Sequence, residues 1–350
     1  MKILHVLSDR TAQGGVPIFA LDVIFALHER GVKQFVICRP YDDFLHPLRK
    51  AGIPFETVDF NKWNKWLMKK WIPWKILHRI KSYAPDVVHC WKPQAAEWTP
   101  AGSGVPVLGW FGGYLDMKHH KHCDYWMGCA PDLADWIGKE SGHPDRVFMV
   151  NTFVSLQGDA PLSREEFSIP GDMSVILLLG RMSEEKGIDI LLRASVNLDV
   201  FLLLAGDGAK LETYRRLAQD LGIESRVRFL GWRTDRAALL EISDILVMPS
   251  RIEGFGMVMA EAWSKGVPVV ASRAEGPRQY IKHGINGMLS DIDDVDGLAK
   301  NLRAVLEDKS LPERLIIEGK RTYEAQFTKD VVISKLLESY EEIIHRGVPS

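Results

Sequence analysis

Short runs of apolar residues alternate along the chain with stretches whose apolar side chains recur at the spacing of a helix, as in residues 17–31. The short runs are continuous and rich in β-branched residues, so they predict strands buried on both faces. In the first half these predicted strands cover residues 2–7, 34–39, 55–60, 86–91 and 105–111. In the second half they cover residues 174–180, 200–208, 226–232, 244–250 and 267–272.

This strand–helix alternation predicts parallel sheets covered by helices, and its two blocks predict two such sheets. We therefore expect an α/β protein with two Rossmann-like, doubly wound domains. Residues 151–172 are rich in Gly, Pro, Ser and acids and are the best linker candidate. The expected first domain covers residues 1–160 and the second 161–328, and residues 329–350 contain a further segment with helical spacing.

Composition limits the classes of function. With 350 residues, of which 46% are hydrophobic and 26% charged, the chain can bury two cores. A formal net charge of -2 gives no overall attraction to nucleic acid, so we expect no nucleic-acid partner. No apolar run approaches the roughly 18 residues of a membrane-spanning helix, and the first residues lack the apolar core of a secretory signal, so we expect a cytoplasmic protein. The 4 cysteines form no CxxC pair and are expected to be free thiols.

Ligands of open α/β sheets bind at the carboxyl ends of the strands, so the loops after the predicted strands are the places to look for chemistry. Residues 180–187 offer Arg181 and Lys186, which could flank a diphosphate or could be solvated loop charges. Gly206 lies in a tight turn that either contacts a ligand or is purely structural. Gly14 and Gly15 would allow close approach to a ligand, but they lack the full G-x-G-x-x-G spacing.

The stretch "RIEGFGMVMAEAW" (251–263) is the most informative. Gly254 and Gly256 let the backbone turn sharply, and the helix predicted to start near Met257 directs its free amides and positive dipole end at an anion such as phosphate. Glu261 lies about one turn inside that apolar helix, where an acid is costly without a partner. A polyol such as ribose, whose vicinal hydroxyls suit one carboxylate, would be such a partner. The alternative is a capping acid, Glu253, followed by a chance helix glutamate.

Several motifs together resemble the C-terminal half of a family 4 retaining glycosyltransferase with the GT-B fold, in which two Rossmann-like domains face a cleft. The spacing of Glu253 and Glu261 matches the E-x7-E motif of that family. The resemblance is specific from about residue 174 to 300 and covers the whole chain in architecture. It is carried by Gly180-Arg181, Lys186-Gly187, "FLG" (229–231), residues 243–272 and residues 284–299.

The resemblance implies transfer of a hexose-type sugar from a nucleotide-sugar donor with retention, without a metal or other cofactor, and with a UDP-sugar rather than a GDP-sugar. It implies that residues 329–350 pack back on the first domain. The implied catalytic residues are Arg181 and Lys186, which neutralise the diphosphate, and Glu253, which contacts the donor sugar. The implied donor-binding residues are Gly14, Gly15, Gly180, Gly206, Gly254, Phe255, Gly256, Met257 and Glu261.

The first domain should hold a glycan or lipid-linked acceptor. Residues 86–98 and 109–137 resemble a branch of the family that builds bacterial surface polysaccharide or lipopolysaccharide core. Where many members carry a histidine after the strand at 105–111, this chain has Gly112-Gly113-Tyr114, so the candidate acceptor-side residues are Gly113, Tyr114, Asp116, Lys118 and His119. The cluster of His119, His120, His122 and Cys123 is expected to be a solvated basic loop rather than a metal site, because these positions do not share a helix face.

Residues 61–81 combine basic residues with tryptophans and contain no acid. This mixture suits an anionic lipid surface, so we expect residues 61–71 to attach the first domain peripherally to the inner face of the plasma membrane. The alternative for residues 74–81 is a helix whose Ile76, Leu77 and Ile80 belong to the core.

Two other functions remain open from the sequence. A GT-B sugar-nucleotide epimerase would share the fold and the nucleotide site but would need acid and base side chains near the sugar. A non-catalytic sugar-binding protein is disfavoured by the E-x7-E motif. A dehydrogenase is disfavoured by the missing dinucleotide fingerprint.

Overall fold

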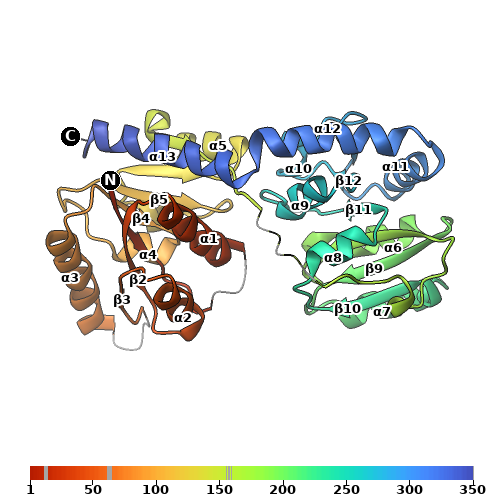
Figure 1. Cartoon of the computed structure of the whole chain (residues 1–350), viewed down its shortest axis with the longest axis horizontal. Coiled ribbons are helices and arrows are strands. Elements are labelled where there is room, and N and C mark those ends of the chain that lie inside the picture. Colours follow the sequence, from red (N-terminus) through yellow and green to blue (C-terminus); the bar gives the residue numbers. More distant parts are fainter. Residues whose placement is uncertain (12–14, 61–64, 155, 157, 159, 350) are drawn as a thin grey trace. The chain divides into compact units, whose positions relative to one another are not determined.

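The computed structural model describes the chain except residues 12–14, 61–64, 155, 157, 159 and 350, and it describes no side chains for residues 65–69. The chain divides into two compact units (Figure 1). Unit 1 comprises Met1–Thr152 and Lys329–Ser350, and unit 2 comprises Phe153–Thr328. The division falls after Thr152, earlier than the residue 160 that we expected from composition. The chain from Phe153 onward belongs to unit 2 by its contacts, although the polar composition of the linker continues to residue 172.

In the described part of unit 1, a seven-stranded parallel sheet has the order β3-β2-β1-β4-β5-β6-β7. The central strand β1 is buried from its second residue onward, as expected for a strand covered on both faces. The strands are β1 (Lys2–Val6), β2 (Lys33–Cys38), β3 (Phe55–Thr57), β4 (Val87–Cys90), β5 (Val107–Phe111), β6 (Tyr125–Gly128) and β7 (Val147–Met149).

In the described part of unit 2, a six-stranded parallel sheet has the order β10-β9-β8-β11-β12-β13, which is the doubly wound Rossmann order. The strands are β8 (Ser174–Leu179), β9 (Val200–Ala205), β10 (Val227–Gly231), β11 (Ile245–Met248), β12 (Val269–Ser272) and β13 (Met288–Ser290). The predicted fold class, two parallel-sheet α/β domains, is confirmed.

Helices connect the strands and flank both sheets (Figure 1). Those of unit 1 are α1 (Gly15–Glu29), α2 (Asp42–Lys50), α3 (Lys65–Tyr83), α4 (Pro93–Trp98), α5 (Pro131–Ser141) and α13 (Lys329–Arg346). Those of unit 2 are α6 (Ile188–Ala194), α7 (Leu211–Asp220), α8 (Arg236–Glu241), α9 (Met257–Lys265), α10 (Pro277–Tyr280), α11 (Val295–Glu307) and α12 (Leu311–Gln326). The last helix, α13, packs on α1 and β4 of unit 1.

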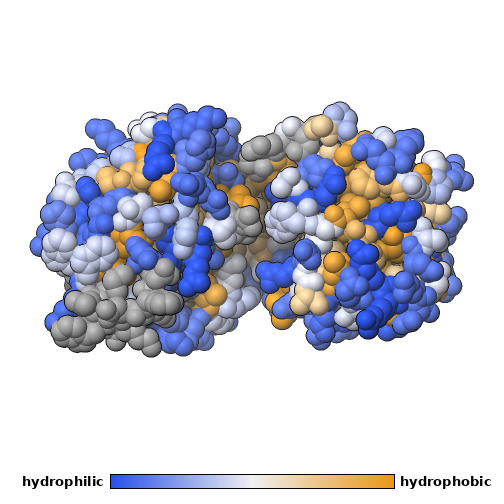
Figure 2. Space-filling model, turned by 90° about the horizontal axis from the view of Figure 1, so that it is seen from below, coloured by the Kyte–Doolittle hydropathy of each residue, from blue (hydrophilic) through white to orange (hydrophobic). Residues whose placement is uncertain are grey.

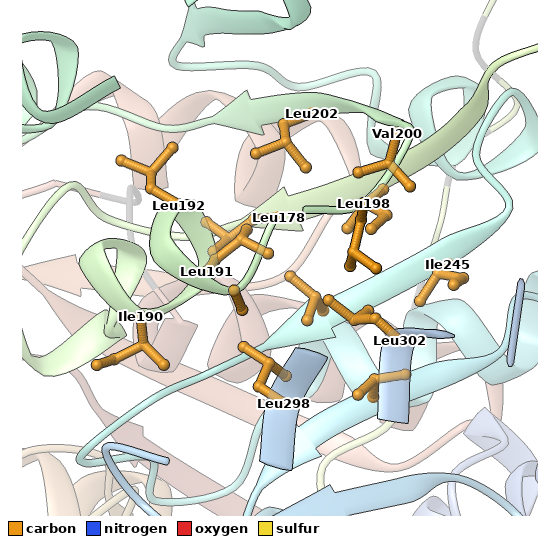
Figure 3. Packing of buried hydrophobic residues seen from close by; sticks show 14 of the residues in the cluster. Leu178, Ile190, Leu191, Leu192, Leu198, Val200, Leu202, Ile245, Leu298 and Leu302 are labelled. Atoms are coloured by element: carbon orange, nitrogen blue, oxygen red, sulfur yellow. The ribbon is translucent and has the colours of Figure 1, made fainter. Parts of the chain in front are cut away.

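The two cores differ in chemistry. In unit 2, aliphatic side chains from α6, β8, β9 and α11 interdigitate, as Leu191, Leu202 and Leu298 show (Figure 3). In unit 1, buried imidazoles lie among aromatic rings: His89 stacks on Trp91 with centroids 4.1 Å apart, and its Nδ1 lies 2.6 Å from the hydroxyl of Tyr340 on α13. On the face seen in Figure 2, hydrophilic residues interrupt the hydrophobic areas of both units.

The structure adds three strands that the apolar pattern did not predict. These are β6, β7 and β13, each of only three or four residues. These strands lie toward one edge of their sheets, where short pairing segments suffice and the sequence signal is weak.

Candidate active site

The strand order of the unit 2 sheet reverses between β8 and β11, and such switch points are where open α/β sheets bind ligands. Lys186 lies in the short 3-10 turn Glu184–Lys186 that follows β8, and its Nζ donates to Oε2 of Glu253 at 2.6 Å. Both side chains line a small hollow at the ends of β8 and β11, together with Ser250. The structure therefore brings together two of the three predicted catalytic residues. The third, Arg181, follows β8 at the same sheet edge and is exposed.

The Gly254-to-Met257 turn leads into helix α9, which begins at Met257 as predicted. Gly256 is the N-cap, with a φ of 89° that favours glycine, and a Cβ there would lie 2.8 Å from Met248. Glycine supplies no capping side chain, and the amide of Met259 donates to the carbonyl oxygen of Gly256 at 2.9 Å, so the amides of Met257 and Val258 are those that can meet an anion. Phe255 is buried against Tyr280 and Phe327, which anchors the turn in the core of unit 2.

Glu261 is fully buried in α9, between Ala260 and Ala262, which are also fully buried. Its Oε1 accepts a hydrogen bond from Nη1 of Arg236 at 2.5 Å, and its Oε2 is buried with no partner among the described residues. Burial raises the pKa of the Glu261 carboxyl, and the charge of Arg236 opposes that rise. One oxygen of this buried carboxylate thus has a hydrogen-bonding capacity that none of the described residues satisfies.

The remaining predicted donor-binding glycines divide into two groups. A Cβ on Gly206 would lie 1.9 Å from the carbonyl oxygen of Gly180, so close packing of the ends of β8 and β9 explains Gly206 without a ligand. Gly15 is the first residue of α1 in unit 1 and is exposed. Gly14 lies outside the described residues.

The predicted acceptor-side residues all lie in the segment that follows β5. Asp116 is the N-cap of the 3-10 turn Met117–His120, and it forms an ion pair with Lys118, while Nδ1 of His119 lies 3.3 Å from Glu97. The ring of Tyr114 meets Trp136 edge-on, and a Cβ on Gly113 would contact nothing within 4 Å. Asp116 and Lys118 thus pair with each other near the surface, which supports a role in forming this turn at least as well as a role in binding an acceptor.

The neighbouring histidines correct one expectation. His120 is fully buried, with its ring 4.0 Å from that of Phe111, and Cys123 is also buried, so this segment is not a solvated basic loop. Burial lowers the pKa of His120 to about 4. No group of three or more potential metal ligands occurs in the part of the chain that the structure describes.

The corresponding switch point of unit 1, between β1 and β4, holds a pair that the sequence analysis missed. Nζ of Lys92 lies 3.2 Å from Oδ1 of Asp9, whose side chain is only 10% exposed and whose Oδ2 is buried without a partner among the described residues. Beside it, the buried guanidinium of Arg39 donates to the carbonyl oxygen of Ser8 at 2.6 Å and to Oε1 of Gln94 at 3.0 Å. Burial raises the pKa of Asp9, and the charge of Lys92 opposes the rise. The available signal was position, since Asp9 and Lys92 each closely follow a predicted strand.

Comparison with known proteins identifies the family. The family described as "Glycosyl transferases group 1" matches residues 159–322. The lipopolysaccharide core biosynthesis glycosyltransferase LpsE of Rhizobium meliloti (strain 1021) is 31% identical over 340 residues, which cover 97% of this chain and 98% of LpsE. The chain belongs to the group 1 glycosyltransferases.

Solved glycosyltransferase structures share the fold. A glycosyltransferase from Rickettsia africae matches with a TM-score of 0.85 and 20% identity, covering 98% of each chain. Anabaena HepE, solved in complex with UDP-glucose, matches with a TM-score of 0.80 and 20% identity, covering 98% of this chain and 100% of HepE. The resemblance to GT-B glycosyltransferases of the lipopolysaccharide-core branch, inferred from the sequence, is confirmed.

The switch point of unit 2 holds the Lys186–Glu253 pair and the glycine-capped N-terminus of α9, and the buried carboxylate of Glu261 lies about one turn farther along that helix. None of the described helices is both long and apolar enough to cross a membrane.

Proposed function

We propose that the chain transfers a hexosyl residue, with retention of anomeric configuration, from a UDP-hexose to a hydroxyl of a glycan or lipid-linked acceptor in bacterial envelope polysaccharide synthesis. The observation that carries the proposal is the arrangement at the end of β11: a lysine–carboxylate pair, an open helix N-terminus, and a buried carboxylate with one unpartnered oxygen. The lysine and the helix N-terminus suit the negatively charged diphosphate of the donor, and the buried carboxylate suits the vicinal hydroxyls of its ribose.

In this mechanism the acceptor oxygen forms a bond to the anomeric carbon while the bond from that carbon to the diphosphate breaks. The acceptor proton passes to an oxygen of the leaving phosphate, so no separate base is required. Lys186, Arg181 and the first amides of α9 stabilise the negative charge that develops on the leaving group, each contributing about 3 kcal/mol when well placed. Lys186 exchanges its contact with Glu253 for the phosphate, which frees Glu253 to bind a hydroxyl of the donor sugar.

The choice of UDP rests on structural likeness. HepE, which shares the fold over nearly the whole chain, was solved with UDP-glucose. LpsE, which is related over its whole length, is described as a lipopolysaccharide core biosynthesis enzyme, and this supports a core glycan as acceptor.

The unit 1 switch point is our candidate for the acceptor. The unpartnered Oδ2 of Asp9 can accept a hydrogen bond from an acceptor hydroxyl, and Lys92 keeps the carboxylate charged. An uncharged, hydroxyl-rich group suits this arrangement, because the buried cation Arg39 is already hydrogen-bonded by protein oxygens.

The enzyme assay uses UDP-glucose, UDP-galactose and GDP-mannose, with core-truncated lipopolysaccharide as acceptor and mass and NMR detection of products. We expect transfer of one hexosyl unit from a UDP-sugar, with the anomeric configuration of the donor kept in the product. Conversion of the donor to an isomer would indicate the epimerase, and binding without any reaction would indicate the sugar-binding protein. Transfer from GDP-mannose alone would overturn the choice of UDP.

We also propose that unit 1 binds the cytoplasmic face of an anionic membrane through α3. Residues 61–64 of the predicted surface lie outside the described residues, and the side chains of residues 65–69 are not described. Beyond them, Trp71 and Trp74 are 43% and 59% exposed, beside the exposed Lys70. On the same helix Ile72, Ile76 and Ile80 are buried, so α3 presents an indole-bearing, basic face while its other face packs in the core.

Co-sedimentation with vesicles tests this proposal. Binding should require phosphatidylglycerol, weaken with salt and fall when Trp74 is replaced by Ala together with Lys70→Glu. Trp232→Ala is the matched control, because Trp232 is an equally exposed tryptophan in unit 2. Equal binding to phosphatidylcholine vesicles, or equal loss in the control, would contradict the proposal.

A further inference from the structure

Glu261 is an unusual residue to bury. It is 0% exposed, within a helix whose neighbouring residues Ala260 and Ala262 are fully buried, and an unpaired carboxylate in such a place is strongly destabilising. Among the described residues, its charged partner is Arg236, the first residue of α8. The pair spans two helices that pack against each other, α8 and α9.

The contact between the two side chains is one-sided. Nη1 of Arg236 donates to Oε1 of Glu261, whereas Oε2 has no partner among the described residues. Arginine–carboxylate pairs are frequently bidentate, with two parallel hydrogen bonds that use both carboxylate oxygens. Here one oxygen is held by Arg236, and the other is buried without a partner among the described residues.

Arg236 also sets the charge of Glu261. Burial raises the pKa of the Glu261 carboxyl, and the charge of Arg236 opposes this rise. The guanidinium is about one-third exposed, so it reaches from solvent to the buried oxygen. Without this cation the pKa of the Glu261 carboxyl would rise further, and a protonated carboxyl is a weaker acceptor for two vicinal hydroxyls.

We propose that Arg236 is a positioning residue of the donor site, which holds Oε1 of Glu261 so that the open Oε2 is presented to the ribose hydroxyls of the donor. This inference rests on the proposed function, in which Glu261 binds the ribose. Arg236 acts through Glu261 and has no part in stabilising the leaving group. Its effect is therefore confined to donors that carry ribose hydroxyls.

The test compares the affinity of the full chain for UDP and for 2′,3′-dideoxy-UDP by calorimetry. The wild type should prefer UDP about tenfold or more, since a charge-assisted hydrogen bond is worth roughly 1.5–3 kcal/mol. Arg236→Ala should weaken UDP binding by about tenfold, leave the affinity for the dideoxy compound unchanged, and so abolish most of the preference. Arg236→Lys, which keeps the charge, should restore part of it.

The matched control is Lys265→Ala. Lys265 on α9 pairs through its Nζ with Glu241 on α8 at 2.7 Å, so its side chain links the same two helices through a carboxylate other than that of Glu261. This variant should keep the full preference for UDP. Two outcomes would overturn the inference and show that Arg236 only holds the helices together. One is loss of the preference for UDP in Lys265→Ala, and the other is an equal fall in the affinity for UDP and for the dideoxy compound in Arg236→Ala.

The pH dependence of the affinity for UDP is a further test, because a purely structural role of Arg236 would not change it. The affinity for UDP should fall on acidification as Glu261 becomes protonated, and in Arg236→Ala this fall should begin at a higher pH than in the wild type. Coincident pH profiles would contradict the inference. Wild-type protein that binds UDP and its dideoxy analogue equally would overturn both the ribose role of Glu261 and this inference, whereas a wild-type preference that survives in Arg236→Ala would overturn the inference alone.

Discussion

The switch points of the two sheets carry the same kind of pair in different surroundings. In unit 2, Lys186 and Glu253 lie 2.6 Å apart beside the glycine turn and open N-terminus of α9. In unit 1, Lys92 and Asp9 lie 3.2 Å apart beside Arg39, whose guanidinium is already hydrogen-bonded by Ser8 and Gln94. The first setting offers a helix N-terminus without a capping side chain, and the second offers a carboxylate oxygen that has no partner among the described residues.

This difference shows how one fold serves two ligands. A doubly wound sheet places its loops at one edge, and the residues after the strands decide what binds there. Helix amides and a lysine suit a diphosphate, whereas a carboxylate oxygen beside a cation suits a neutral hydroxyl. Changes at the unit 2 switch point should therefore affect the donor, and changes at the unit 1 switch point should affect the acceptor.

The largest expected effect is on turnover in Lys186→Ala. Loss of one charge that stabilises the leaving diphosphate should lower kcat by about 10²- to 10³-fold. Lys92→Ala should leave kcat within a few-fold and mainly raise the KM for the acceptor. Steady-state kinetics with separate variation of donor and acceptor measures both. An equal fall in kcat for the two variants would show that the pairs are equivalent and would break the comparison.

Acidification should destabilise unit 1 more than unit 2, because unit 1 buries neutral histidines. Burial lowers the pKa of His5 and of His120 to about 4 and places that of His89 well below its usual range. The unfolded state then binds more protons between pH 4 and 6.5, so stability falls as pH falls through this window. From pH 7.5 to 5.5 the loss is about 1 kcal/mol for each such histidine.

Unit 2 should behave in the opposite way. The raised pKa of Glu261 means that its folded form binds protons more readily, so acidification stabilises it, and the raised pKa of Asp9 offsets part of the loss in unit 1. Hydrogen exchange of amides in β1 and β8, corrected for the intrinsic effect of pH, separates the units. His120→Leu should reduce the stability that unit 1 loses between pH 7.5 and 5.5 by about 1 kcal/mol. Equal loss of protection in β1 and β8 would contradict the prediction.

The sequence predicted the unit 2 site better than the unit 1 site for a physical reason. Glu253 and Glu261 lie on one turn and the helix that follows it, so their spacing along the chain reflects their spacing in space. The partner of Glu261, Arg236, is 25 positions away on another helix, where it resembles any surface arginine. Asp9 and Lys92 meet only because β1 pairs with β4, and no local pattern records that pairing.

Asp9→Asn should have a smaller effect, confined to the acceptor. The amide keeps the size of the side chain but loses the charge, so the KM for the acceptor should rise about tenfold, the worth of roughly one charge-assisted hydrogen bond. The affinity for UDP measured without acceptor should stay unchanged. Glu253→Gln is the matched change in unit 2 and should alter donor rather than acceptor kinetics. Weaker UDP binding in Asp9→Asn would place Asp9 on the donor side and break the comparison.

The smallest expected effect is that of chelation. The acidic residues Asp291 and Asp293, which follow β13, form ion pairs with Arg273 at 3.3 Å and with Arg251 at 2.7 Å, so a protein cation lies beside each carboxylate. We propose that Lys186 and Arg181 supply the positive charge that a divalent ion supplies in metal-dependent transferases. Turnover should therefore survive EDTA unchanged, and added Mg²⁺ or Mn²⁺ should not raise the residual activity of Lys186→Ala. Loss of turnover in EDTA with recovery on adding either ion would show that the unit 2 switch point needs a cation beyond its own side chains.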